Sequence, residues 1–307
     1  MSCARPADGG GAPVGREWEC VRLAPVQPSQ PNVAVVGHVE WVQFARVAHV
    51  PCAGEVVHAR DPFEEPAGGG AVAAVQLARL AGEALLVTAL GEDDHGRRSV
   101  ARLSELGVDV RASFEDAPTR RAVTLVDEAG ERTITTFGPR LEPLAGGEQE
   151  RLGTLEQVDA LYFTAGDEAG LRIARARSPV LVASPRARGA LGHGVPLDAL
   201  VLSGDDEIEV RAAAPALEEA DLVVWTEGAR GGRYRRRDGE TGTFAAAAVP
   251  GPRADSYGCG DSFAAGFTYG LGAGLELADA LALAARCGAV CLTGHGPYER
   301  QLSRADL

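Results

Sequence analysis

The chain has 307 residues, of which 45% are hydrophobic and 24% are charged, a composition typical of a soluble globular protein. This length suffices for one large α/β domain, or for one domain with a small appendage. The net charge of −13 argues against nucleic acid or an anionic membrane as a partner, and no run approaches the ~18 apolar residues that span a bilayer.

Residues 1–31 are predicted to be a disordered N-terminal extension, and residues 32–307 a single domain. The extension is rich in Gly, Pro and Gln and lacks the charged-then-apolar order of a signal peptide. The six cysteines show no C-x-x-C pair. We therefore expect buried thiols in a reducing compartment and a cytoplasmic protein.

The first predicted strand, residues 32–39, is a short apolar run that ends just after a glycine. Ligand groups gather at the carboxyl ends of such strands. His38, Glu40 and Trp41 follow, and together they could form a polar pocket with an aromatic wall. The alternative is a strand end with a partly buried tryptophan.

The next two features are a glycine run and an acidic turn. Gly68, Gly69 and Gly70 open an Ala/Leu-rich helix and permit close backbone approach, but no Lys-Ser/Thr pair follows them, so the phosphate-loop signal is weak. After a second buried strand at residues 84–90, the turn at 91–96 could bind metal. Capping of the following helix explains that turn adequately.

Two β segments, near residues 44–62 and 119–137, belong to neither strand–helix repeat and suit a small lid. Arg120 lies where it could reach a substrate or a phosphate, although a solvated strand arginine explains it almost as well.

The C-terminal half alternates between apolar strands and stretches long enough for helices. The strands are expected at 158–163, 180–183, 199–202 and 222–226. This alternation predicts an α/β fold with a parallel sheet covered on both faces. Each strand ends in small or polar residues, at 164–166, 184–186, 203–206 and 226–228, where ligand sites of open sheets gather.

The most informative stretch, residues 249–271, has the pattern of a loop that leads into a helix. Gly258 and Gly260 flank Cys259, so the backbone can turn tightly and leave its amides exposed. Amides at a helix start carry partial positive charge, which suits a phosphate. Asp261 among them is either a helix cap or a catalytic base, and the residues alone leave these alternatives even.

This stretch resembles the second signature of the ribokinase-like (PfkB) carbohydrate kinases, D-[ST]-x-G-A-G-D. Five residues match it: Asp255, Ser256, Gly258, Gly260 and Asp261. Only Cys259 departs, at a position usually held by Ala. The resemblance implies a ribokinase-like three-layer α/β/α fold with a mostly parallel central sheet and a small β lid.

The resemblance also implies an ATP-dependent phosphotransferase that acts on a hydroxyl of a sugar, a nucleoside or a related small polyol. The amides of Gly258, Cys259 and Gly260 would form an anion hole, and Asp261 would be the catalytic base. Because a helix start favours a carboxylate, we expect the pKa of Asp261 to be lowered.

Nucleotide and metal contacts follow from the same resemblance. The segment Ser203–Glu207 resembles the family's N-x-x-E, which places Asp206, or Glu207 in its stead, near Mg²⁺ through water, with helix capping as the alternative. The residues expected near ATP are Ser203, Thr226, Gly228, Gly231 and, in the C-terminal turn, Gly296. Asp255 could contribute to a monovalent cation site for K⁺.

At the acceptor end the expected residues are His38, Glu40, Gly68, Gly69, Gly70 and Arg120. Two family ligands are missing there: Val42 stands near the usual acid, and Val72 stands at the usual Asn (Gly70 in a shifted register). The acceptor is therefore left unnamed. A homodimer through the lid is a further expectation, since the lid supports dimers in this family.

Two other functions compete with the kinase. A non-catalytic ligand-binding or regulatory protein on a kinase fold would explain the altered signatures, although the intact Asp261 argues against it. A nicotinamide-dependent oxidoreductase is disfavoured, because no G-x-G-x-x-G follows the first strand.

Overall fold

The computed structural model describes residues 30–146 and 151–307, so nearly all of the expected N-terminal extension lies outside the described residues. Its main sheet has nine strands in the order β13-β12-β11-β10-β9-β8-β1-β4-β5. Their bounds are β1 (Val33–Val36), β4 (Ala84–Gly91), β5 (Val108–Glu115), β8 (Ala160–Phe163), β9 (Val180–Ala183), β10 (Leu197–Ser203), β11 (Ala220–Thr226), β12 (Gly232–Arg236) and β13 (Thr241–Phe244). The strands from β11 to β5 pair in parallel, and β12 and β13 are antiparallel at one edge.

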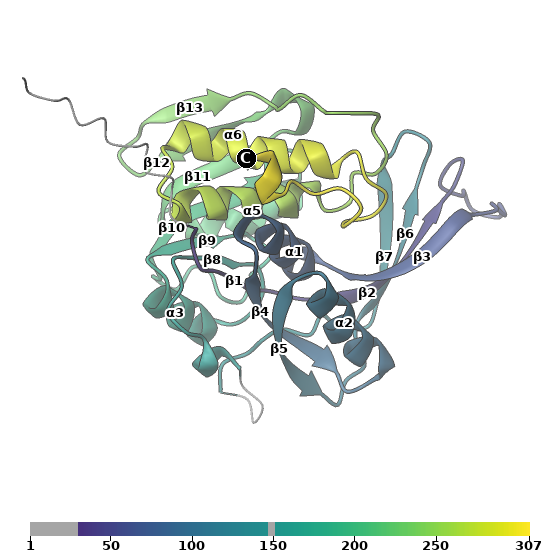
Figure 1. Cartoon of the computed structure of the whole chain (residues 1–307), viewed down its shortest axis with the longest axis horizontal. Coiled ribbons are helices and arrows are strands. Elements are labelled where there is room, and N and C mark those ends of the chain that lie inside the picture. The colour runs from purple at the N-terminus through teal and green to yellow at the C-terminus, as the bar shows by residue number, and fades with distance from the viewer. Residues whose placement is uncertain (1–29, 147–150) are drawn as a thin grey trace, which may run out of the picture.

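Helices cover both faces of this sheet (Figure 1). One face carries α1 (Gly69–Ala81), α2 (Asp94–Glu105), α5 (Cys259–Gly272) and α6 (Leu277–Cys291), and the other carries α3 (Glu168–Arg177) and α4 (Glu207–Ala213). Alternate residues of β1 divide between the two cores, because successive side chains of a strand point to opposite faces: Val33 and Val35 join the first, Ala34 and Val36 the second. The three-layer α/β/α fold predicted from the sequence is confirmed.

A second sheet of four strands, in the order β3-β2-β6-β7, forms the lid. Its strands are β2 (Glu40–Arg46), β3 (Arg60–Ala67), β6 (Arg121–Val126) and β7 (Arg132–Phe137). It projects from one side of the main body (Figure 1). Because β2 begins at Glu40, only three residues separate the main sheet from the lid.

Aromatic packing joins the lid to the loop that precedes α5. Phe44 stacks on Phe63 with ring centroids 4.8 Å apart and meets Tyr257 edge-on at 4.9 Å. The acceptor end and the phosphate end of the expected site therefore share one hydrophobic support. No helix within the described residues is long and apolar enough to cross a membrane.

Candidate active site

The loop before α5 ends in a left-handed glycine, and the N-cap of the helix lies three residues before Asp261, the cap that the sequence offered as an alternative. Gly258, with φ of 80°, is the N-cap residue, and Asp261 lies in the first turn rather than at the cap. The first amides of a helix have no acceptor within it. Gly260 is exposed and a Cβ built on it would meet nothing within 4 Å, so the start of α5 is open on that side. The start of α5 can therefore receive an anion.

Asp261 is held in a partly desolvated position between opposing charges. Burial raises its pKa above the ordinary value, Arg186 and Arg132 act against that rise, and Glu209 adds to it. The expectation of a lowered pKa is wrong, because burial destabilises the charged carboxylate more than the nearby arginines stabilise it. A carboxylate with a raised pKa is a better proton acceptor than an ordinary one.

The glycine run lies so close to the end of β1 that side chains would not fit. A Cβ on Gly70 would lie 2.6 Å from the carbonyl carbon of Gly37. A Cβ on Gly69 would lie 3.0 Å from Asp261 Oδ1 and 3.5 Å from His38 Cε1. The end of β1 and the starts of α1 and α5 therefore meet at one point, and that point requires glycine.

His38 is 5% exposed, and within the described part of the chain its Nδ1 has no hydrogen-bond partner. A Cβ on Gly68 would lie 3.1 Å from His38 Nε2, so the ring occupies the space beside that glycine. Burial, and then the charges of Arg140, Arg186 and Arg120, lower the pKa of His38 well below its ordinary value. A neutral imidazole with an unused nitrogen is suited to bind a hydroxyl.

Glu40 and Arg120 form the second pair at the acceptor end, with Arg120 Nε 3.4 Å from Glu40 Oε2. Burial raises the pKa of Glu40, against the nearby charge of Arg120. Arg120 follows Thr119, whose hydroxyl donates to Asp93 Oδ1 over 2.8 Å. Asp93 also caps α2 through the amide of Gly96, as the sequence predicted for that turn. The same cap therefore fixes the segment that carries Arg120.

Trp41 does not wall this pocket, and the expectation of an aromatic wall is wrong. Its ring stacks on His95 at a centroid distance of 5.3 Å, and the guanidinium carbon of Arg98 lies 4.2 Å from its centroid. Both neighbours belong to α2. Adjacent residues of a strand point to opposite faces, so Glu40 and Trp41 are separated by the lid sheet.

Val72, at the family's Asn position, is fully buried beneath the loop before α5. A Cβ on Gly258 would lie 2.9 Å from Val72 Cγ1. Val72 therefore supports the loop by packing, and its side chain offers an acceptor molecule no hydrogen bond.

Arg186 and Glu209 are two site residues to which sequence reasoning gave no role. Arg186 Nη2 lies 2.8 Å from Glu209 Oε1, and both charges act on Asp261. Arg186 stands at one of the predicted strand ends, and Glu209 is three residues beyond the N-cap Asp206, where a capping-box acid is expected. All 30 basic residues of the chain are arginines. Any side-chain cation that faces a phosphate here is therefore an arginine.

The two acids expected near magnesium have other contacts. Asp206 caps α4 by accepting from the amides of Ile208 and Glu209, and the side chain of Glu207 is 90% exposed and lies near Arg211. Over the described residues no group of three or more His, Cys, Asp or Glu side chains could hold a metal ion. Glu209 is the more buried acid of this segment.

The residues expected near the nucleotide lie together at the carboxyl ends of β10 and β11. Ser203 and Thr226 are direct partners in the sheet, and the Ser203 amide donates to Glu209 Oε2 over 2.9 Å. Gly228 and Gly231 form the turn after β11, where a Cβ on Gly231 would lie 2.1 Å from a carbonyl oxygen. The turn therefore depends on glycine.

Asp255 and Gly296 form a separate cluster below the loop. Asp255 Oδ1 accepts from the amide of Tyr257 over 2.8 Å, and Oδ2 accepts from the amide of Gly296 over 2.9 Å. Gly296 is buried, and a Cβ there would lie 2.6 Å from a ring carbon of Phe63 in the lid. These two residues therefore tie the loop to the C-terminal turn and the lid.

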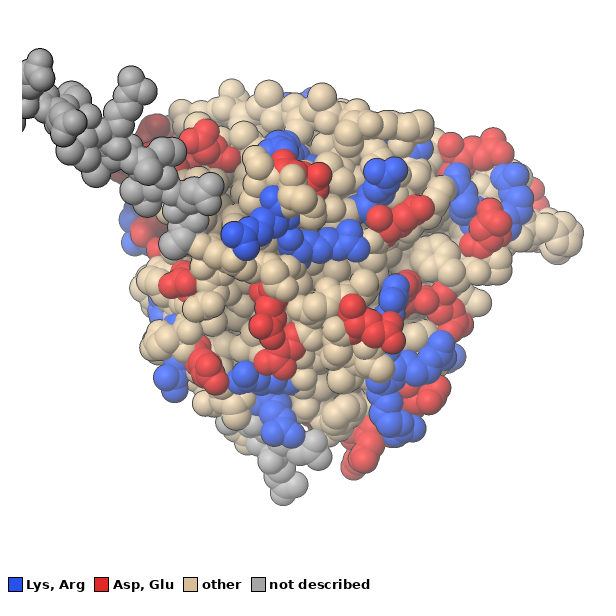
Figure 2. All heavy atoms as spheres, in the orientation of Figure 1, with Lys and Arg blue, Asp and Glu red and all other residues tan. Residues whose placement is uncertain are grey.

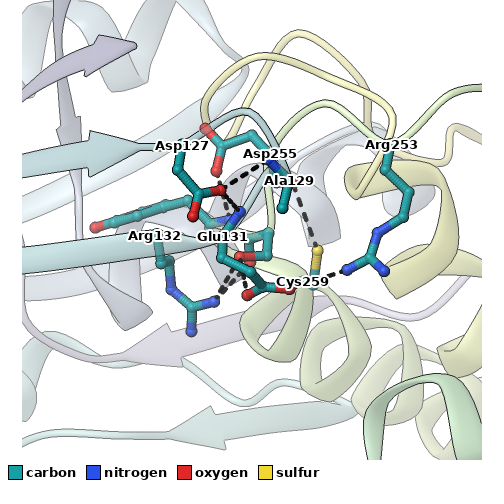
Figure 3. Close-up of polar contacts among 9 residues, drawn as sticks. Asp127, Ala129, Glu131, Arg132, Arg253, Asp255 and Cys259 are labelled. Atoms are coloured by element: carbon teal, nitrogen blue, oxygen red, sulfur yellow. Dashed lines mark hydrogen bonds and ion pairs between the residues drawn. The ribbon is translucent and has the colours of Figure 1, made fainter. Parts of the chain in front are cut away.

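The turn between β6 and β7 lies directly on the loop before α5, as Figure 3 shows. Arg132 Nη1 donates to the carbonyl and hydroxyl oxygens of Ser256 over 3.1 and 3.0 Å. Glu131 pairs with Arg253 at 3.1 Å, and the Ser256 amide donates to Gly130 O over 3.0 Å. The lid and the loop are thus joined beside Asp261.

Comparison with known proteins places this geometry in a class. The chain matches the model of the pfkB family carbohydrate kinases over residues 30–178 and 197–303. A fructokinase of Klebsiella pneumoniae is 30% identical over 284 residues, which cover 78% of this chain and 91% of the relative. A ribokinase of Schizosaccharomyces pombe is 26% identical over 306 residues, with 86% and 93% covered. The crystal structure of a ribokinase from Thermotoga maritima has a TM-score of 0.71 at 23% identity, covering 90% of this chain and 97% of that one.

The fold is therefore that of the ribokinase-like kinases. The chain belongs to the pfkB family of carbohydrate kinases, and it is an ATP-dependent phosphotransferase with an alcohol group as acceptor. Membership of this family implies ATP as the phosphoryl donor and, as a rule, Mg²⁺ with it.

Proposed function

We propose that this kinase transfers the γ-phosphoryl group of ATP to a hydroxyl of a small polyol, with Asp261 as the catalytic base. The observation that carries the proposal is the position of Asp261. Its carboxylate lies in the first turn of α5, directly after the glycine-flanked amides, and at the Gly69 meeting point beside His38.

The step needs little covalent help from the protein, because phosphoryl transfer depends mainly on positioning and charge neutralisation. The acceptor oxygen bonds to the γ-phosphorus, the bond from that phosphorus to the bridging oxygen breaks, and ADP leaves. Asp261 takes the hydroxyl proton. The amides of Gly258, Cys259 and Gly260 hold the phosphoryl oxygens as charge builds in the transition state.

Arg186 is the side-chain cation that we assign to the transferring phosphoryl group. Its guanidinium is fixed by Glu209 on one side and acts on Asp261 on the other. A guanidinium matches the geometry of phosphate oxygens. Of the acids in this segment, Glu209 is the one that could face a magnesium ion through water; such an ion would be bound mainly by phosphates and water and would neutralise charge on the nucleotide.

The acceptor is expected between Asp261 and the buried group formed by His38, Glu40 and Arg120. Among the described residues His38 Nδ1 has no hydrogen-bond partner, and Arg120 Nε has no hydrogen bond beside its ion pair with Glu40, which is costly unless a ligand supplies the missing partners. Neutral hydroxyls satisfy both nitrogens. This pattern favours a polyhydroxylated acceptor.

The carboxylate of Asp255 is poorly suited to bind a monovalent cation. Each of its carboxylate oxygens already accepts an amide hydrogen, and burial raises its pKa. We therefore assign Asp255 a structural role, linking the loop to the C-terminal turn, and include no K⁺ in the reaction.

We further infer a cytoplasmic enzyme that forms homodimers through the lid. Every residue of the edge strand β7 is exposed, and Ile134 and Phe137 are 41% and 47% exposed. A second copy of the lid would cover this edge. Light scattering on the purified chain tests this, and a monomer at micromolar concentration would contradict it.

A coupled ADP-release screen over sugars, nucleosides and polyols tests the proposed function. We expect one acceptor class to raise ADP release well above the ATPase background, and the product to carry a new phosphate ester. ATP binding without ADP release from any acceptor would instead favour a ligand-binding or regulatory protein, which the altered acceptor end also suits.

A further inference from the structure

Two cysteines meet where the anion loop touches the end of another helix. Cys259 is the first residue of α5, and its side chain is partly exposed. Cys291 is the last residue of α6 and is fully buried. A Cβ on Gly288, one turn before Cys291, would lie 3.2 Å from the carbonyl oxygen of Cys259. The two helices therefore bring these residues into direct proximity.

Both thiols contact carbonyl oxygens of the same short loop: Cys259 Sγ is 4.0 Å from Asp255 O, and Cys291 Sγ is 3.4 Å from Tyr257 O. Figure 3 shows the sulfur of Cys259 directed toward that loop. All four cysteines in the described residues are reduced. The pair is therefore two reduced thiols that lie against the same short loop, Asp255 to Tyr257.

We propose that Cys259 and Cys291 are an oxidation site, at which a peroxide converts the two thiols into a reversible disulfide. The site itself stands on this geometry alone. Its effect on catalysis rests on the proposed function, because Cys259 contributes one of the anion-hole amides.

The chemistry balances with hydrogen peroxide as the oxidant. Cys259 Sγ gives up its proton and attacks one peroxide oxygen, the O–O bond breaks, and a sulfenic acid and one water result. Cys291 Sγ then attacks the sulfenic sulfur, the S–S bond forms, and hydroxide leaves with the Cys291 proton as the second water. The thiols lose two electrons in total, and the peroxide is reduced to two waters.

The order of these steps follows from exposure. Cys259 is the thiol that peroxide can reach. Cys291 is buried, so it reacts second, with the sulfenic acid formed on Cys259.

Disulfide formation would move the backbone of the anion hole. To form the bond, the two sulfur atoms must approach to a separation of about 2.05 Å, and the Cβ–S–S–Cβ dihedral angle must take one of its preferred values. Cys259 lies between two glycines, whose backbone is flexible. Strain from the disulfide would therefore displace the amides of Gly258, Cys259 and Gly260. Loss of one such donor lowers turnover by roughly 100-fold. We expect reversible loss of kinase activity on oxidation.

Peptide mapping decides whether the disulfide forms, and it needs no kinase activity. The full chain is treated with hydrogen peroxide, its remaining thiols are alkylated, and it is digested with trypsin. Cleavage after Arg253, Arg286 and Arg300 yields peptides 254–286 and 287–300. The expected product is a disulfide-linked pair of these peptides that separates on reduction.

The second peptide holds both Cys287 and Cys291, so matched variants of α6 are required. Cys287 points elsewhere, since a Cβ on Gly266 would lie 2.5 Å from its sulfur. We expect Cys287→Ser to keep the cross-link and Cys291→Ser to lose it. A cross-link that survives Cys291→Ser, or peroxide treatment that leaves Cys259 and Cys291 as free thiols in the unaltered chain, overturns the proposal.

The catalytic consequence is read separately from ADP release. Oxidation of the unaltered chain should reduce release by roughly 100-fold, with recovery on reduction, while Cys291→Ser should resist this loss. If the cross-link forms and activity is unchanged, the switch is refuted although the oxidation site stands. If the reduced chain has no activity on any acceptor, the proposed function fails, while the mapping still decides the disulfide.

Discussion

The acidity of Asp261 is set first by burial and then by charged neighbours of opposite sign. Burial raises its pKa, Arg186 lowers it and Glu209 raises it further. A base must be deprotonated to accept a proton, so kcat/KM should fall as pH drops through this raised pKa. The acid limb of the profile is therefore expected at a higher pH than for an ordinary aspartate.

Substitution of Glu209 or of Arg186 should shift the pKa of Asp261 in opposite directions. Removal of negative charge by Glu209→Gln should move the acid limb of kcat/KM to lower pH, and removal of positive charge by Arg186→Gln should move it to higher pH. The measurement is the pH profile of kcat/KM for each variant, with Asp238→Asn, an exposed turn residue, as the control. Shifts of the same sign in both variants would contradict the charge arrangement.

At the scale of single residues, the sequence predicted the site residues that lie within one short motif and missed those that come from distant parts of the chain. Asp261 and its glycines lie within one short motif, so their spacing alone indicates an anion site with a carboxylate. Arg186 follows β9 and Glu209 lies in the first turn of α4, so both act on Asp261 from distant parts of the chain, and no local spacing reveals this arrangement. The pKa was misjudged for the same reason, because burial depends on the assembled fold.

The lid and the α5 loop act as one element, since the β6–β7 turn is bonded to Ser256. Arg132 supplies two of those hydrogen bonds and also acts on Asp261. Substitution of Arg132 should allow the lid to open, while the conformation of the glycines in the loop before α5 stays unchanged. The acceptor should therefore be held less well than ATP.

We expect Arg132→Gln to raise KM for the acceptor by about tenfold, the equivalent of one charge-assisted hydrogen bond, with a smaller change in KM for ATP. Steady-state kinetics with each substrate varied in turn would measure this. Arg121→Gln, an exposed arginine on the same hairpin, is the matched control and should behave like the unaltered chain. An unchanged acceptor KM in Arg132→Gln would show that the contact does not hold the lid closed.

At the element scale the alternation of apolar strands predicted β9 at Val180–Ala183 and most of the other parallel strands closely, but it gave no strand at β5 (Val108–Glu115). The lid segments were recognised, although β2 starts earlier and β3 ends later than expected. Trp41 was misplaced because its facing depends on where the lid strand begins. Once β2 starts at Glu40, the alternation of the strand puts Trp41 on the far side.

In the whole molecule the proposed phosphate end comes from one short stretch of the chain, whereas the proposed acceptor end is built from distant segments. His38, Arg120, Arg140 and Arg186 come together only in the folded chain, which is why the sequence named the reaction and left the acceptor open. Acidic and basic groups are interspersed over the face shown in Figure 2. Over its described residues this face therefore carries no large patch of one charge sign (Figure 2).

The central claim, that Asp261 is the catalytic base, is tested most directly by Asp261→Asn. Once an acceptor is known, ADP release by this variant should fall by at least about 100-fold, since positioned bases contribute on this scale. Thermal stabilisation by ATP should persist, and the melting temperature without ligand should be equal or higher, because a buried charge has been removed. Turnover within about tenfold of the unaltered chain would contradict the account.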